Sequence, residues 1–153
     1  MLGFSQNHLF VNNIASSIIA TKDSLKTIGL VLNHDVADDI SNNQPQKYSI
    51  ILPFFQEDLI LDLEKFKPFK DDLTIISKTA SGDSVLSILP TVLSYKLSFE
   101  DDYIGVLNWV NGAFLASFQI ESKQYEISFF QNKYLLFESS NSINPSNFQC
   151  NTM

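Results

Sequence analysis

Alternation of apolar and polar residues is the dominant pattern in the second half of the chain. Between Leu93 and Phe99 an apolar residue occupies every second position, and serine or lysine lies between. This two-residue period is typical of a strand that buries one face. Four further segments that are predicted as strands follow, each separated from the next by a polar turn. These segments are Tyr103–Val110, Ala113–Ile120, Tyr125–Phe130 and Tyr134–Glu138. The pattern predicts an antiparallel β-meander over the C-terminal half.

Two of these predicted strands carry large apolar residues on one face. The residues are Phe114, Ala116, Phe118 and Ile120 in one strand, and Tyr125, Ile127 and Phe129 in the next. Side chains two positions apart point to the same side of a strand. We therefore expect one face of the sheet to be rich in aromatic rings and packed against the core.

The N-terminal region has a different period. From Asn13 to about Leu32, apolar residues recur at spacings of three, four and seven, which is typical of an amphipathic helix. Asn12 or Asn13 could cap the start of this helix, and Asn33 would end it. We expect the polar stretch from Asn33 to Gln46 to form a loop, with a short turn of helix around Val36–Ile40.

The middle of the chain predicts shorter elements. Tyr48–Leu52 is interpreted as a strand that ends at Pro53, and Leu59–Leu63 fits a strand or a short helix. Leu73–Ser77 predicts a further strand. Pro90 interrupts the segment that begins at Val85, so a short helix or strand is expected before it and a strand after it.

These elements together predict an α+β fold. An antiparallel β-meander in the C-terminal half would pack against an N-terminal amphipathic helix. Residues 1–139 are expected to form this single domain. Residues 140–153, rich in serine and asparagine, are expected to form a polar C-terminal tail.

The net charge of the chain argues against binding to nucleic acid. The chain has 17 acidic and 10 basic residues, a formal net charge of -7, and every basic residue is a lysine. Nucleic acids are polyanions, and phosphate recognition commonly relies on the planar arginine side chain. We therefore expect this chain not to bind nucleic acid.

The sequence also favours a cytoplasmic protein without a membrane span. The N-terminal residues lack the basic and apolar regions of a secretory signal, and the single cysteine, Cys150, cannot form an internal disulfide. The run from Tyr103 to Ile120 has no charged residue and approaches the length of a membrane helix. However, Asn111–Gly112 within it is a hairpin turn signal, so two strands are expected instead.

No pattern of catalytic or cofactor-binding residues is present. The five glycines are scattered and form no phosphate-binding loop, and neither histidine accompanies a nucleophile pattern. The nearest approach to a metal site is His34–Asp35 with Asp38 and Asp39, whose spacing fits no known ligand set. We expect no enzymatic activity, no cofactor and no metal.

Acidic residues instead gather at predicted turns and strand ends, several of them beside aromatic residues. Glu57–Asp58 follows Phe54–Phe55, for example. Acidic surfaces accelerate association with basic partners, and neighbouring aromatics can anchor them. The residues hypothesised to form a partner-binding face are Phe69, Asp71, Asp72, Glu100, Asp101, Asp102 and Tyr103.

In size, acidity and lack of active-site residues, the chain resembles the small acidic immunity proteins of bacterial toxin-delivery systems of the contact-dependent type. The resemblance implies a non-catalytic inhibitor that covers the active site, or a neighbouring surface, of a basic toxin domain such as a nuclease. One alternative is a ligand-binding or enzymatic α+β domain with an apolar pocket between helix and sheet. Another is a structural or accessory subunit of a phage or a secretion apparatus.

Overall fold

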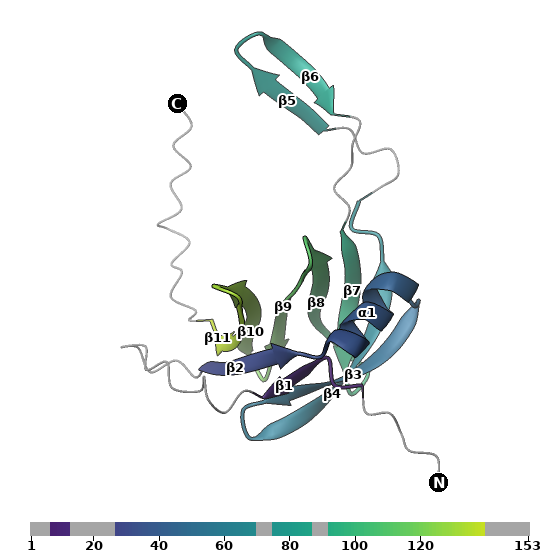
Figure 1. Cartoon of the computed structure of the whole chain (residues 1–153), viewed down its shortest axis with the longest axis vertical. Helices are drawn as coiled ribbons and strands as arrows, with labels where there is room; N and C mark the ends of the chain where they lie inside the picture. Colours follow the sequence, from purple (N-terminus) through teal and green to yellow (C-terminus); the bar gives the residue numbers. More distant parts are fainter. Residues whose placement is uncertain (1–6, 13–26, 70–74, 87–91, 140–153) are drawn as a thin grey trace.

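A large antiparallel sheet dominates the computed structural model, which describes residues 7–12, 27–69, 75–86 and 92–139 (Figure 1). Nine strands form this sheet in the order β1-β2-β11-β10-β9-β8-β7-β4-β3. Their bounds are β1 Phe10–Asn12, β2 Thr27–Leu32, β3 Lys47–Phe54, β4 Glu57–Phe66, β7 Leu93–Phe99, β8 Asp102–Val110, β9 Ala113–Ile120, β10 Lys123–Phe130 and β11 Lys133–Glu138. A separate hairpin pairs β5 (Ile75–Thr79) with β6 (Gly82–Leu86).

The sheet curls until its two outer strands meet, which makes it barrel-like. Every neighbouring pair is antiparallel, so the first and ninth strands, β1 and β3, run in the same direction. Accordingly, the contact that joins these edges is parallel. It consists of a bridge between His8 and Ile51, in which the Ile51 amide donates to the Asn7 carbonyl at 3.0 Å. This join is a single bridge, whereas the antiparallel neighbours in the sheet are paired over three to eight residues.

The predicted α+β fold class is therefore wrong, because strands make up most of the described structure. Part of the predicted N-terminal helix is the strand β2, and residues 13–26 lie outside the described residues. In β2, Ile28, Leu30 and Leu32 alternate with residues of the outer face, and pairing with β1 and β11 stabilises the extended backbone. The spacing of the apolar residues in this region fits both the period of a helix and that of a strand. Pairing with β1 and β11 selects the strand.

The one described helix, α1 (His34–Asn43), lies where a loop with a short helical turn was expected. Asn33 begins this helix instead of ending an earlier one, because its side chain accepts a hydrogen bond from the Asp35 amide at 3.2 Å. Gln44 closes the helix in a left-handed conformation, donating its backbone amide to the Ile40 carbonyl. Ala37 and Ile40 are the buried residues of the helix.

The predicted meander is confirmed. Strands β8 to β11 lie within about two residues of their expected bounds, and the turn at Asn111–Gly112 is present. The segment Leu59–Leu63 belongs to the strand β4, which settles the choice between strand and helix. Pro53 lies inside β3, where it pairs with Asp58 near the edge of the sheet and does not end the strand.

The predicted aromatic face is confirmed in β9 and only partly in β10. Phe114 and Phe118 are fully buried in β9, and Tyr125 and Ile127 are buried in β10. Phe129 is 43 % exposed, because β10 extends past the core at that point.

Gly105 permits an unusually close approach between β8 and β9. It follows a β-bulge, since the pairing of β7 with β8 shifts between Leu97 and Ser98. A Cβ atom at this position would lie 2.1 Å from the Ser117 carbonyl oxygen and 2.6 Å from the Cα of Phe118. A bulge of this kind increases the local twist of a sheet, and glycine permits the close approach of the two backbones.

The barrel-like sheet has two unlike ends. At the helix end, α1 connects β2 to β3, and the turns β8–β9 and β10–β11 lie beside it. At the open end lie the turns β3–β4, β7–β8 and β9–β10. Strands alternate in direction, so the two sets of turns must fall on opposite ends.

The described residues include no helix that is long and apolar enough to cross a membrane. The charge-free run from Tyr103 to Ile120 forms the hairpin of β8 and β9, as expected from its turn signal.

Candidate functional site

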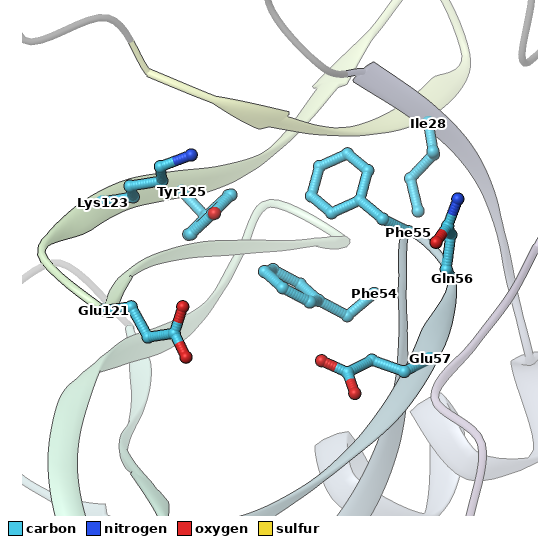
Figure 2. A pocket seen from close by; sticks show the side chains of 8 residues that line it. All are labelled: Ile28, Phe54, Phe55, Gln56, Glu57, Glu121, Lys123 and Tyr125. Atoms are coloured by element: carbon cyan, nitrogen blue, oxygen red, sulfur yellow. The ribbon is translucent and has the colours of Figure 1, made fainter.

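A groove of about 780 Å³ lies at the open end, where the interior of the sheet meets the surface (Figure 2). The β3–β4 hairpin forms one side, and β10 with the turn before it forms the other. Below, it is called the aromatic groove. Its lining residues are Ile28, Phe54, Phe55, Gln56, Glu57, Glu121, Lys123 and Tyr125.

Aromatic rings form the floor of this groove. The ring of Phe54 lies 4.8 Å from that of Tyr125 and 5.0 Å from that of Phe55, at interplanar angles of 76° and 75°. Phe118, which is buried, supports the floor from below with its ring 5.8 Å from Tyr125. Rings set at such steep angles pack edge to face, so the three rings are turned in different directions around the groove.

Tyr125 brings a polar group into this apolar floor. Its side chain is only 6 % exposed, but its hydroxyl oxygen is not itself buried and forms no hydrogen bond with any residue that the structure describes. Burial raises the pKa of Tyr125, and the charges of Glu138 and Glu121 raise it further. The hydroxyl is therefore neutral at physiological pH, and it can donate or accept a hydrogen bond from a molecule in the groove.

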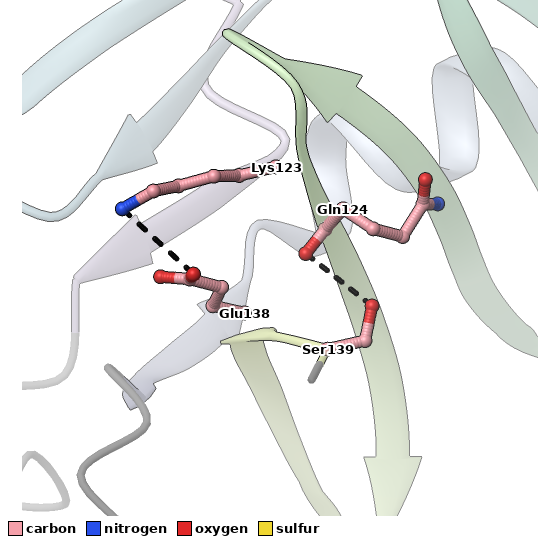
Figure 3. A network of polar contacts seen from close by, with 4 residues as sticks. All are labelled: Lys123, Gln124, Glu138 and Ser139. Atoms are coloured by element: carbon pink, nitrogen blue, oxygen red, sulfur yellow. Dashed lines mark hydrogen bonds and ion pairs between the residues drawn. The ribbon is translucent and has the colours of Figure 1, made fainter. Parts of the chain in front are cut away.

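Two carboxylates form the rim. Glu57 and Glu121 are exposed, and neither forms an ion pair with a described residue. Figure 2 shows them approaching the space beside Phe54 from opposite sides. The only lysine of the groove is already engaged, because the Lys123 ammonium lies 3.8 Å from a Glu138 carboxylate oxygen (Figure 3). The rim thus keeps a negative charge.

Local backbone conformation places these residues at the rim. Phe55 has a positive φ of 54°, which turns the chain sharply between β3 and β4. Glu121 and Ser122 have φ values of 50° and 66°, the left-handed pair of a tight two-residue hairpin. Next to this turn, Ser139 Oγ donates to the Gln124 carbonyl at 3.3 Å and fixes the end of β11 (Figure 3).

The structure brings together only part of the sequence-predicted binding face. Glu100 and Asp101 form the β7–β8 turn at the open end, where Asp102 and Tyr103 begin β8. All four are exposed, Tyr103 by 64 %. They therefore lie at the same end as the aromatic groove.

The remaining predicted residues do not join them. Phe69 follows the end of β4 and therefore lies toward the helix end, away from Glu100–Tyr103. Asp71 and Asp72 lie outside the described residues. A continuous face that includes Phe69 together with Glu100–Tyr103 is thus not what the structure shows.

Sequence reasoning missed the groove itself. The adjacency of Phe54–Phe55 to Glu57–Asp58 was visible as a signal, but Tyr125 and Glu121 are far from these residues in sequence. Only the curling of the sheet places them opposite one another. The aromatic groove lies at the end opposite α1, so it is not the pocket between helix and sheet of the alternative interpretation.

The acidic cluster around His34 is part of a helix and not of a loop. Asp39 accepts hydrogen bonds from Asn43 and from the Tyr48 hydroxyl, the latter at 3.1 Å. Across the ranges that the structure describes, no three His, Cys, Asp or Glu side chains are grouped as a metal site requires.

No family model matches this sequence, and no curated protein or solved structure resembles it closely enough to indicate a family or a function. Functional inference therefore rests on the groove and on the charge around it.

Proposed function

We propose that this chain is a non-catalytic binding protein that neutralises a basic protein partner, in the manner of an immunity protein that covers a toxin domain. The observation that carries the proposal is the combination of acid and aromatic surface at the open end. The exposed acids there are Glu57, Asp58, Glu100, Asp101, Asp102 and Glu121.

Charge is unevenly distributed between the two ends. Among the described residues, lysines lie mostly toward the helix end, as with Lys47, Lys65 and Lys133 at strand ends there. Long-range attraction would therefore orient a basic partner toward the open end before contact. Once there, the aromatic floor offers the kind of apolar surface that supplies most of the binding energy at protein interfaces.

The interior also supports binding at the surface over chemistry within a cavity. The core between the strands is filled by buried apolar side chains, among them Leu52, Leu61, Tyr95 and Phe114. The aromatic groove is an open depression above this core. Such a groove suits a side chain that projects from a partner surface.

The first experiment concerns the gene immediately upstream. If it encodes a large protein, its C-terminal domain is co-expressed with this chain, and the mixture is analysed for a one-to-one complex at moderate salt. We expect a stable complex and protection of cells from that domain. A domain that stays separate, or that remains toxic in the presence of this chain, would contradict the immunity role.

Charge reversal tests which end binds. Asp101→Lys with Asp102→Lys should slow association with the partner about tenfold at low salt and weaken its salt dependence. The matched control is Asp35→Lys with Asp38→Lys, which changes the net charge equally on exposed positions of α1 at the helix end. Equal association rates for the two double variants would show that the open end is not the binding face.

A further inference from the structure

We infer that the aromatic groove binds a single arginine side chain of the partner as the central anchor of the complex. This inference rests on the proposed function and specifies its chemistry. The groove combines three features that suit a guanidinium group: aromatic rings, carboxylates on its edge, and an accessible hydroxyl without a hydrogen-bond partner among the described residues.

The aromatic floor favours a cation. Cations are attracted to the faces of aromatic rings, and the attraction grows when water is excluded. Phe54, Phe55 and Tyr125 present rings at steep mutual angles around one space, so a flat group could contact more than one of them. An uncharged apolar side chain would also fit these rings, but it would leave the acidic rim without a partner.

The rim selects for positive charge with several donors. Glu57 and Glu121 approach the groove from different strands, and neither has an ion-pair partner among the described residues. A guanidinium group carries five N–H donors in one plane and can contact two carboxylates at once, whereas an ammonium acts as a compact point charge. This geometry favours arginine over lysine.

The described residues of the chain offer no cation of their own that fills this role. The protein contains no arginine, and Lys123 turns to Glu138 at 3.8 Å. The Tyr125 hydroxyl supplies an acceptor at the floor of the groove for one guanidinium N–H. The partner's side chain would thus contact the Tyr125 hydroxyl and both rim carboxylates together.

The test uses the whole chain and small blocked amino acids, so it does not require the partner. N-acetyl-arginine methylamide is titrated into the protein, and NMR shift changes are followed at Phe54, Tyr125 and Glu121. We expect saturable binding in about the millimolar range, because a single anchor supplies only part of an interface. The citrulline analogue has nearly the same shape without the charge, and it should produce no saturable shifts.

Variants then assign the binding to the rim. The double variant Glu57→Gln with Glu121→Gln keeps the shapes of the side chains. It should weaken the binding of the arginine analogue about tenfold. The matched control, Glu64→Gln with Glu126→Gln, changes the net charge equally on the outer face of the sheet and should leave binding unchanged. The lysine analogue should bind wild-type protein more weakly than the arginine analogue.

Several results would overturn the inference: no saturable shift at the groove, equal binding of the citrulline analogue, equal or tighter binding of the lysine analogue, or equal weakening by both double variants. The comparison of analogues uses only wild-type protein, so it decides the matter even if a variant fails to fold.

The anchor and the proposed function can fail separately. If the toxin domain forms a complex that Glu57→Gln with Glu121→Gln does not weaken, the binding role stands and the arginine anchor is wrong. If the arginine analogue binds but no toxin complex forms, the groove is a cation site and the immunity role is wrong.

Discussion

The helix end and the open end of the sheet are built from different kinds of contact. At the helix end, polar contacts join α1 and the segment after it to the strands. The Tyr95 hydroxyl donates to the Pro45 carbonyl at 3.0 Å, and the backbone and side chain of Gln46 both bond to Lys65 at 2.9 Å. At the open end, Glu57 and Glu121 form no ion pair with described residues beside an accessible aromatic floor. The polar groups of the helix end thus stabilise the fold, whereas the two carboxylates of the open end remain available to bind a partner.

The turns show this difference only in part. At the helix end, Asn111–Gly112 uses the residue pair that best tolerates two positive φ angles. At the open end, Glu100–Asp101 and Glu121–Ser122 adopt the same left-handed conformations without glycine or asparagine. Each such residue costs about 1 kcal/mol or more. Gln131–Asn132 at the helix end is also left-handed and lacks glycine, so this strain does not by itself distinguish the acidic turns.

The largest expected effect comes from Gly105→Ala, at the bulge that curls the sheet toward the open end. The new Cβ would overlap the Ser117 carbonyl and the Phe118 backbone, so we expect a loss of about 3 kcal/mol in the free energy of unfolding. Urea denaturation measures this loss in the free energy of unfolding. Gly112→Ala is the counterpart at the helix end: no atom lies within 4 Å of its Cβ, and only the φ of 82° opposes the change, at about 1 kcal/mol. Similar losses for both would show that the close approach at Gly105 is not essential.

The next effect concerns α1. Ile40 is fully buried, so Ile40→Ala should lower the free energy of unfolding by about 3 kcal/mol. Glu57→Gln at the open end should change it by less than about 0.5 kcal/mol, because the residue is exposed and unpaired among the described residues. Urea denaturation of both variants tests the division between a stabilising end and a binding end. Comparable losses would remove that division.

Alkaline pH should lower the stability of the fold, and two of the responsible tyrosines lie at the helix end. Burial raises the pKa of Tyr95 and of Tyr48, the latter also through its hydrogen bond to Asp39. A pKa that is higher in the folded state favours folding below the unfolded value of about 10, and this contribution is lost as the pH rises through the folded value. Stability should therefore fall above pH 10.

Tyr95→Phe isolates one of these groups. It removes the hydrogen bond to Pro45 and should lower the free energy of unfolding by about 1 kcal/mol at neutral pH. Because it also removes a titrating hydroxyl, the decline above pH 10 should become shallower. Chemical denaturation between pH 7 and pH 11 measures both, and an unchanged alkaline slope would exclude Tyr95 as a contributor.

The last expected effect is a gain in stability. Replacing Glu100–Asp101 with Asn–Gly relieves two strained positions and should raise the free energy of unfolding by about 1 kcal/mol, while slowing association with a basic partner. The same replacement of Gln131–Asn132, a left-handed turn at the helix end, should stabilise similarly and leave association unchanged. Stopped-flow binding compared with denaturation separates the two outcomes.

The sequence predicted the meander well because its signals are local. The alternation in Leu93–Phe99 and the turn at Asn111–Gly112 need only neighbouring residues to act. The region before Asn33 failed for the opposite reason, since its apolar spacing fits both a helix and a strand. The choice depends on β11, which lies near the other end of the chain. Pairing between strands so far apart in the sequence cannot be predicted from the pattern of neighbouring residues.

The candidate site likewise has one part that could be predicted from the sequence and one part that could not. Glu100–Tyr103 could be proposed from one turn, and the structure keeps these residues exposed at the open end. The aromatic groove could not be proposed from the sequence, because Phe54 and Tyr125 come into contact only across the curled sheet. Phe69 was grouped with Glu100 on residue type alone, and the direction of β4 separates them.

The pairing of β2 with β11 bears on how the protein is made. Leu30 lies opposite Tyr134, so the hydrogen bonds of an early strand are completed by the last strand of the sheet. During synthesis on the ribosome, β2 must wait with an unpaired edge until nearly the whole chain has emerged, since domains fold as their partners become available. A stalled or truncated chain lacking β11 would expose that edge to neighbouring nascent chains, so synthesis through Glu138 is a condition for release of a protein with a paired sheet.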